Sequence, residues 1–191
     1  MDYVKIGANV IKQEANGLQR LAAELDVSFE SAVSLLDCDG KIVLTGVGKS
    51  GHVCRKIAAT MTSLGRPAVF LHPTEAAHGD MALLRSHDAL LAVSRSGTAE
   101  EIKPLLKFAS DHGIPTVLIS ENGKSGLASW VNTVVRLPKV MEAWGHAPTT
   151  STTMQMAVGD AIAVALASRH GWTTKDFLEH HPGGVLGSEM R

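Results

Sequence analysis

The regular alternation of short apolar runs with longer amphipathic segments constrains the fold of this chain more than any other feature. The apolar runs are rich in Val, Ile and Leu, and each leads into a segment predicted to be helical. They span residues 41–45, 67–71, 89–93, 115–119 and 133–137. Strands that are apolar on both faces form parallel sheets covered by helices on both sides. The sequence therefore predicts an α/β fold, a five-stranded parallel sheet flanked by helices on both faces.

The predicted helices have recognisable ends. A long N-terminal helix over residues 2–25 has apolar residues at helical spacing, and we expect it to pack against the sheet or a partner subunit. The other long helices are predicted over residues 51–64, 98–112 and 150–170, and glycines stop them at Gly65, Gly113 and Gly171. Shorter helices are predicted over residues 28–36, with a cap at Ser28, and over 80–84, 125–130 and 173–180.

Charge and composition exclude several classes of function. The chain has 191 residues and a formal net charge of −1, and its Lys and Arg residues are scattered. We therefore expect no nucleic-acid partner and no membrane partner. No apolar run has the length of a signal-peptide core or a membrane span. The two cysteines, Cys38 and Cys54, lack the spacing of a redox or zinc motif. These observations favour a cytoplasmic protein, because thiols stay reduced there.

The stretch TGVGKSGH (residues 45–52) is similar to two phosphate-binding loops, and neither fits completely. Its three glycines match the dinucleotide pattern G-x-G-x-x-G, but the second predicted strand ends near His72 without the acidic residue that would hold a ribose. Its Gly-Lys-Ser matches the end of a nucleoside triphosphate loop, but Val43 stands where that loop needs its first glycine. The remaining interpretation is a loop that brings backbone N–H groups at a helix start close to a smaller anion.

A second loop of similar build, SRSGT (residues 94–98), follows the third predicted strand. It has three hydroxyl groups around one glycine, a set that suits a single phosphate monoester. The alternative is that these hydroxyls only cap the next helix. In parallel sheets of this kind, ligands bind beyond the carboxyl ends of the strands, where both loops are expected to lie. The sequence therefore predicts a phosphate site at that edge of the sheet.

Five segments carry a resemblance to a known family. They are TGVGKSGHVCRKIAATMTSLG, HPTEAAHGDM, SRSGTAEEI, APTTSTTMQMAVGDAIAVAL and HPGGVLG. Together they resemble the sugar isomerase (SIS) domain, and within it the arabinose 5-phosphate isomerases, which interconvert ribulose 5-phosphate and arabinose 5-phosphate. The resemblance implies a five-stranded parallel sheet and a homotetramer whose active sites are completed across subunits. It also implies an aldose–ketose isomerisation through an enediol, with no cofactor and no metal.

By match to these motifs, the resemblance implies catalytic roles for Lys49, Glu101, Glu142 and His181. The candidates for substrate binding are Gly48, Ser50, His72, His78, Ser94, Ser96, Gly97 and Thr98. Glu142 is expected to act as the base, because a partly desolvated carboxylate has a raised pKa.

Simpler interpretations stand beside these roles. Lys49 is otherwise an exposed loop lysine, Glu142 a solvated loop acid, and Glu101 an acid that favours the dipole of its helix. His72, His78 and Asp80 also suggest a metal site, but no third spaced ligand is evident, so the two histidines are interpreted as sugar contacts.

Two departures from the family pattern bear on domain organisation and substrate. Many members carry a pair of regulatory nucleotide-binding repeats (CBS domains) after the HPGG segment, whereas residues 1–191 are expected to form one SIS domain without them. The loop EAWGHAP (residues 142–148) is shorter than usual and brings in Trp144 and His146. The alternatives left open are an isomerase of a hexulose or heptose phosphate, and a phosphosugar sensor without turnover.

Overall fold

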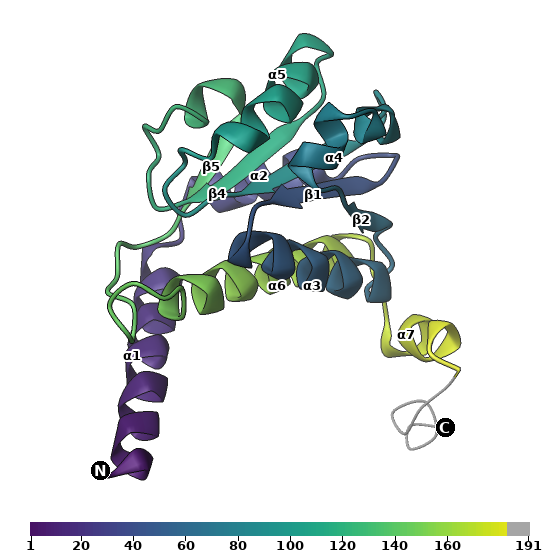
Figure 1. Ribbon diagram of the computed structural model, residues 1–191. Helices are drawn as coiled ribbons and strands as arrows, with labels where there is room; N and C mark the ends of the chain where they lie inside the picture. Colours follow the sequence, from purple (N-terminus) through teal and green to yellow (C-terminus); the bar gives the residue numbers. More distant parts are fainter. Residues whose placement is uncertain (183–191) are drawn as a thin grey trace.

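The computed structural model describes residues 1–182, and a single parallel sheet forms its centre (Figure 1). The strands are β1 (Ile42–Gly46), β2 (Ala68–Phe70), β3 (Ala89–Val93), β4 (Thr116–Ser120) and β5 (Thr133–Arg136). They lie in the order β2-β1-β3-β4-β5, and every neighbouring pair is parallel. The predicted strands and the predicted fold class are confirmed.

Helices cover both faces of the sheet, each over its own apolar core. One layer contains α1 (Tyr3–Glu24), α2 (Val27–Leu36), α3 (Lys49–Ser63) and α6 (Thr150–Arg169). The other contains α4 (Pro73–Ala77), α5 (Lys103–Asp111) and the 3₁₀ turns η1 (Asp80–Leu83), η2 (Glu100–Ile102) and η3 (Ala128–Trp130). Because neighbouring strand residues point to opposite faces, Leu44 enters the first core and Val43 the second. Within residues 1–182, no helix has both the length and the apolar character of a membrane span.

α3 and α6 approach each other closely, because Gly159 of α6 presents no side chain to α3. A Cβ atom at Gly159 would overlap the side chain of Ile57, which is fully buried. Beside this contact, Lys56 Nζ pairs with Asp160 Oδ1 at 2.6 Å. The contact determines where α3 begins relative to α6, and so it positions the loop between β1 and α3.

The predicted glycine stops are confirmed, and one predicted cap is wrong. Gly65, Gly113 and Gly171 follow the last turns of α3, α5 and α6 with φ of +80°, +64° and +63°. Glycine adopts this left-handed conformation without strain. The cap of α2 is Asp26 rather than Ser28, since the Asp26 carboxylate accepts from the Ser28 N–H at 2.9 Å.

Segments on the second layer differ from the prediction. The helix predicted over residues 98–112 begins only as η2 and becomes α-helical at Lys103, because Ala99 is still extended, with ψ of 104°. The helix predicted over residues 125–130 is reduced to η3. α4 was not predicted; Pro73 forms its first turn, and His72 Nδ1 accepts from the Thr74 N–H at 3.3 Å.

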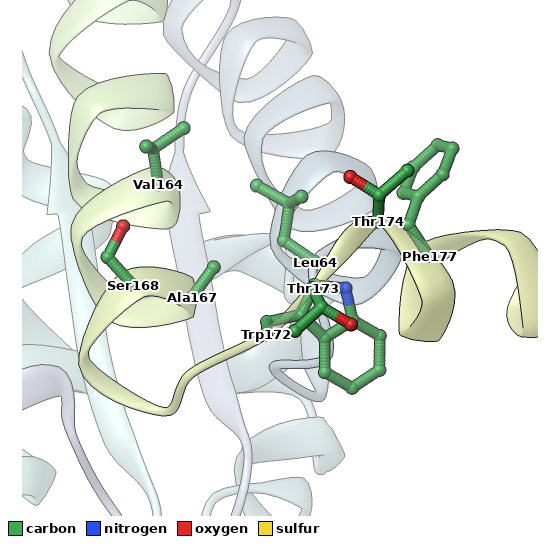
Figure 2. Close-up of a pocket in the computed structure, with 8 residues that line it drawn as sticks. All are labelled: Leu64, Val164, Ala167, Ser168, Trp172, Thr173, Thr174 and Phe177. Atoms are coloured by element: carbon green, nitrogen blue, oxygen red, sulfur yellow. The ribbon is translucent and has the colours of Figure 1, made fainter.

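The last described helix, α7 (Thr174–His180), lies beyond the C-terminal end of α6 and away from the carboxyl ends of the strands (Figure 1). Leu64, Val164, Trp172 and Phe177 line an apolar hollow of about 380 Å³ between α6 and α7 (Figure 2). The N-terminal end of α6 therefore lies near the carboxyl ends of the strands, and its C-terminal end lies beside this hollow.

Gly159→Ala is expected to destabilise the protein, although alanine favours a helix over glycine by about 1 kcal/mol. The added methyl group presses on Ile57, and overpacking of this kind costs about 1–3 kcal/mol. Gly126→Ala, in the connection between β4 and η3, is the control, because no atom lies within 4 Å of an added Cβ there and its φ is not positive, and it is expected to keep the melting temperature. Thermal melting at one protein concentration measures both variants. A Gly159→Ala protein as stable as the wild type would contradict the close contact.

Candidate active site

A cavity of about 370 Å³ lies at the carboxyl ends of β1, β3 and β4. Its walls are Val47 and Ser50 after β1, residues 93–96 and Ala99 at and after the end of β3, and Glu121 after β4. β1 and β3 are neighbours in the sheet, although β2 lies between them in the sequence. The connections from these two strands therefore lead to opposite sides of the sheet. Such a switch point is where open parallel sheets bind ligands.

The SRSGT loop forms one wall of this cavity. Ser96 Oγ and Thr98 Oγ1 are exposed and lie 2.7 Å apart, and Thr98 N–H donates to Ser96 Oγ at 3.3 Å. Ser94 is buried, and its Oγ accepts from the Gly97 N–H at 3.2 Å. Gly97 has φ of +68°, and a Cβ there would overlap Ser125, so only glycine suits this turn. No side chain among the described residues caps η2 or α5, so the interpretation of these hydroxyls as helix caps is wrong.

The first turn of α3 forms another wall. Gly48 precedes the helix with φ of +59°, Lys49 is exposed, and Ser50 is half-buried. Ser50 Oγ donates to Oε1 of Gln155, a buried residue of α6, at 3.2 Å. Among the described residues no side chain caps this helix start, so its first N–H groups remain available to an anion.

Glu142 follows β5 and is buried, so the interpretation as a solvated loop acid is wrong. Its side chain is 0% exposed. The carboxylate accepts from the Thr149 N–H at 2.9 Å, from Thr149 Oγ1 at 3.2 Å, from the Ser151 N–H at 3.2 Å and from Ser151 Oγ. Thr149 and Ser151 stand at the start of α6, whose first N–H groups have no acceptor within the helix. Glu142 therefore supplies the acceptor at that helix end.

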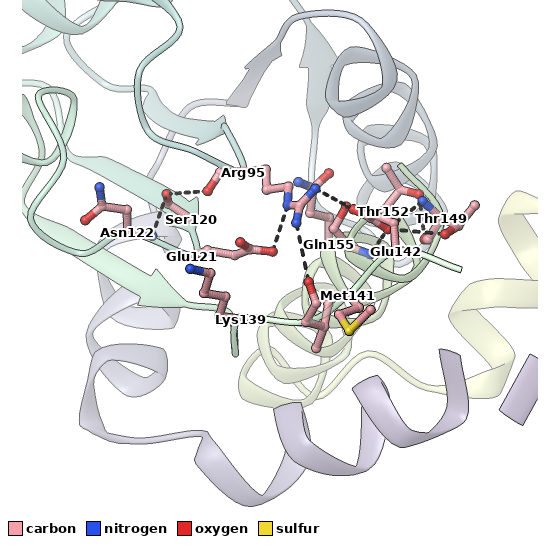
Figure 3. A network of polar contacts seen from close by, with 12 residues as sticks. Arg95, Ser120, Glu121, Asn122, Lys139, Met141, Glu142, Thr149, Thr152 and Gln155 are labelled. Carbon is pink, nitrogen blue, oxygen red and sulfur yellow. Dashed lines mark hydrogen bonds and ion pairs between the residues drawn. The ribbon is translucent and has the colours of Figure 1, made fainter. Parts of the chain in front are cut away.

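Arg95 connects this carboxylate to the SRSGT loop (Figure 3). Its Nη1 lies 2.7 Å from Glu142 Oε1, its Nε donates to Glu121 Oε1 at 2.9 Å, and its Nη2 donates to the Val140 carbonyl at 3.4 Å. The Arg95 carbonyl accepts from Ser120 Oγ at 3.1 Å and from the Glu121 N–H at 3.0 Å. One residue thus joins the segments that follow β3, β4 and β5.

The expected rise in the pKa of Glu142 is wrong. Burial is the largest single influence and acts to raise this pKa. The hydrogen bonds from Ser151 and Thr149, together with the charge of Arg95, outweigh it and lower the pKa below its ordinary value of 4.5. Glu142 is therefore an ionised carboxylate at neutral pH, and its pKa is not tuned toward neutrality as expected of a general base.

The other candidates lie at the same edge of the sheet but outside the walls of this cavity. Glu101 is exposed on η2, which packs against α4. His72 and His78 flank α4; His78 is exposed, whereas His72 lines a separate hollow of about 170 Å³ with Gly48 and Arg55. In the part of the chain that the structure describes, no three His, Cys, Asp or Glu side chains gather as metal ligands would.

His181 does not reach this cavity within one subunit. It follows α7, and its ring stacks on Phe177 with 3.9 Å between the ring centroids. α6 has 20 residues and is therefore about 30 Å long, and it separates α7 from Glu142 and Thr149 (Figure 1). A single subunit places His181 at one end of the molecule and Lys49 and Glu101 at the other.

Arg95, Glu121 and Gln155 belong to this site, although sequence reasoning did not single them out. Arg95 lies inside the SRSGT loop and Glu121 directly follows β4, so the rule on the carboxyl ends of strands could have indicated both. Gln155 gives no such signal, because it lies between two methionines inside a largely apolar helix.

Glu142→Gln is expected to lower the free energy of unfolding at neutral pH by about 1–3 kcal/mol, because Arg95 loses an ionised partner. The pKa of Glu142 is lower in the folded state than in the unfolded state. Its stabilising contribution is thus fully present above about pH 4.5 and is lost as the pH falls through the folded-state pKa. Urea titrations of the wild type and the variant are expected to show a stability difference that is constant above about pH 4.5 and narrows as the pH falls below it. A difference that widens toward acid would contradict the lowered pKa.

Comparisons with known proteins are consistent with this geometry. The model of the SIS domain family matches residues 34–165. The arabinose 5-phosphate isomerase KdsD of Yersinia pestis is 40% identical over 193 residues, which cover 100% of this chain and 59% of KdsD. The arabinose 5-phosphate isomerase KpsF of Escherichia coli O6:H1 is 39% identical over 184 residues, 94% of this chain and 56% of KpsF. The chain therefore spans less than two thirds of the length of these curated relatives.

Solved structures give the same result over whole chains. The structure of E. coli CFT073 c3406 in complex with arabinose 5-phosphate superimposes with a TM-score of 0.90 at 34% identity, covering 95% of this chain and 98% of that one. A putative sugar-phosphate isomerase from Listeria monocytogenes also gives a TM-score of 0.90, at 28% identity, covering 96% of this chain and 100% of that one. With its fold, its motifs and the family model in agreement over most of its length, the chain belongs to the SIS domain family.

Proposed function

We propose that this protein is an isomerase that interconverts D-ribulose 5-phosphate and D-arabinose 5-phosphate through an enediol. The observation that carries the proposal is the cavity at the β1/β3 switch point, which combines exposed hydroxyls with an uncapped helix start. These groups suit the phosphate of a sugar phosphate. The relatives named arabinose 5-phosphate isomerase, and the c3406 complex with arabinose 5-phosphate, support this choice of sugar.

The proposed chemistry divides the site into an anchor and a reacting end. The phosphate binds the hydroxyls of the SRSGT loop and the N–H groups at the start of α3, with Ser50 beside them. Isomerisation then moves a proton between C1 and C2, which needs a base and a partner for the negative charge on the enediolate oxygens. Lys49 supplies that positive partner in the proposal. Glu101 is the proposed base, because its carboxylate is exposed and has no ion pair among residues 1–182.

The proposed assembly is a homotetramer in which His181 completes the site of a neighbouring subunit. The length of α6 prevents His181 from reaching the cavity of its own subunit. The first half of α1 projects from the body and exposes Tyr3, Val4, Ile6 and Ile11 (Figure 1). The hollow between α6 and α7 is a second apolar surface (Figure 2). Contiguous apolar surfaces of this kind mark interaction sites.

The proposed compartment is the cytoplasm. Cys38 and Cys54 are both unpaired thiols, and Cys54 is buried, where burial raises the pKa of its thiol. Thiols that are not joined in disulfides are typical of reducing compartments.

Purified protein is expected to convert ribulose 5-phosphate into arabinose 5-phosphate in the presence of a chelator, because enediol chemistry here needs only protein groups. Proton NMR in D₂O follows both the new aldose signals and the exchange of the proton at C2. Hexulose and heptose phosphates tested in the same way determine which substrate is preferred. Binding of arabinose 5-phosphate with no exchange on any of these sugars would refute the isomerase and favour a sensor.

Lys49→Ala and His181→Ala are each expected to lose most turnover, and to regain part of it when the two chains assemble together. A site that takes Lys49 from one subunit and His181 from another is intact in some mixed assemblies. With random pairing into twofold dimers, about half of the dimers are hybrids with one intact site of two, so the mixture has about a quarter of wild-type activity and the isolated hybrids about half. Co-expression with two different tags isolates the hybrids.

Lys49→Ala mixed with Glu101→Ala is the control, because both residues lie at the same end of one subunit, and no recovery is expected. Hybrids that assemble but show no recovery in the first mixture contradict shared sites.

A further inference from the structure

Three charged side chains cross the strand ends beside the cavity. In the Glu121–Arg95–Glu142 triad, Arg95 Nε lies 2.9 Å from Glu121 and Arg95 Nη1 lies 2.7 Å from Glu142 (Figure 3). Arg95 and Glu121 line the cavity, and their side chains are 35% and 12% exposed, whereas the side chain of Glu142 is 0% exposed. Arg95 thus connects the cavity wall to a carboxylate in the protein interior.

The guanidinium of Arg95 is already engaged by the protein. Its Nε, Nη1 and Nη2 are directed at Glu121, Glu142 and the Val140 carbonyl. One positive charge faces two carboxylates, so the triad as a whole carries a net negative charge and does not attract a phosphate. Arg95 therefore organises the protein around the cavity, although it lies inside the loop proposed to bind phosphate.

The carboxylate of Glu142 is engaged as well. Its two oxygens offer about four lone-pair positions. Thr149 and Ser151 each donate an N–H and a hydroxyl to these oxygens, and Arg95 donates through Nη1. A general base needs a lone pair within hydrogen-bond reach of the proton that it removes. A saturated carboxylate with no exposed surface does not provide one.

The triad connects the walls of the cavity. On one side, Arg95 is part of the loop that presents Ser96 and Thr98. On the other side, Glu142 holds the first turn of α6, and Gln155 in the next turns of that helix accepts from Ser50 of α3. The loop after β3 and the starts of α6 and α3 are thereby held in one arrangement.

We propose that Arg95 and Glu142 act as a pair of positioning residues, which hold the SRSGT loop and the starts of α6 and α3 in the geometry that isomerises the sugar phosphate. This inference rests on the proposed function, and it replaces the interpretation of Glu142 as the base. Positioning of this kind has a large effect on rate, because a misplacement of about 1 Å can cost on the order of 100-fold.

The test is paired neutralisation. Arg95→Gln and Glu142→Gln are each expected to lower kcat/KM about 10- to 100-fold. Arg95→Gln leaves the buried Glu142 carboxylate without its cation, and Glu142→Gln removes the ionised acceptor that holds Arg95 Nη1. The double variant replaces the ion pair with two amides and keeps the net charge of the triad. The second substitution removes the buried carboxylate that Arg95→Gln leaves unpaired, so the double variant is expected to recover about tenfold over Arg95→Gln.

The same measurements distinguish positioning from base catalysis. If Glu142 is the base, no change at Arg95 restores it, and Glu142→Gln and the double variant both stay on the order of 10²- to 10⁴-fold below the wild type. That result overturns the proposal, as does wild-type activity in both single variants. If either glutamine variant does not fold, Arg95→Lys tests the proposal instead. Lysine keeps the positive charge but cannot contact Glu121 and Glu142 through two separate nitrogens, as Arg95 does. A kcat between those of the wild type and an inactive variant supports positioning, and an unchanged kcat overturns it.

Asp88→Asn is the matched control. Asp88 is another buried carboxylate, bound by the Lys41 N–H at 2.9 Å, by Lys41 Nζ at 2.6 Å and by the Arg85 N–H at 2.8 Å, but it precedes β3 at the opposite end of the sheet. The Asp88→Asn variant is expected to have a lower melting temperature and an unchanged kcat. It therefore separates an effect on positioning from a general loss of stability. A wild-type protein inactive on every sugar phosphate refutes the proposed function itself, whereas an active wild type with an unaffected Arg95→Gln overturns only this inference.

Discussion

The ion pair between Arg95 and the buried carboxylate of Glu142 fixes the arrangement of this site. A charge without partners in a protein interior is very costly, so a buried carboxylate persists only where donors surround it. The donors of Glu142 come from the loop after β3 and from the start of α6. None of these segments can shift without exposing or unpairing a charge. The parallel sheet brings the segments to one edge, and the ion pair fixes the loop after β3 relative to the start of α6.

This arrangement has a consequence for phosphate recognition. The single arginine of the SRSGT loop is engaged by Glu121 and Glu142, so the loop offers hydroxyls and backbone N–H groups instead of a guanidinium. The uncapped start of α3 adds the partial positive charge of a helix N-terminus. Neutral donors of this kind hold a phosphate less tightly than a forked ion pair does. Such binding suits the proposed isomerisation, in which the product carries the same phosphate as the substrate.

The length of α6 separates two further parts of the proposed mechanism. Its N-terminal end borders the site, and its C-terminal end leads to α7 and His181. If His181 takes part in the chemistry, association of subunits becomes a requirement for activity and not only a source of stability. The exposed apolar residues of α1 and the hollow beside α7 then have a role that a single subunit does not explain.

The features of this protein that depend on local patterns could be predicted from its sequence. Apolar runs alternating with amphipathic segments gave the five strands and both helical layers, and glycines with positive φ marked the ends of α3, α5 and α6, because these signals act within a few residues. The motif resemblance led correctly to the SIS family. The ionisation of Glu142 could not be predicted in this way, because it depends on contacts between distant segments. The direction of its pKa shift depends on Arg95, which is distant in the sequence, and on donors at the start of α6, and burial without them would have produced the opposite shift.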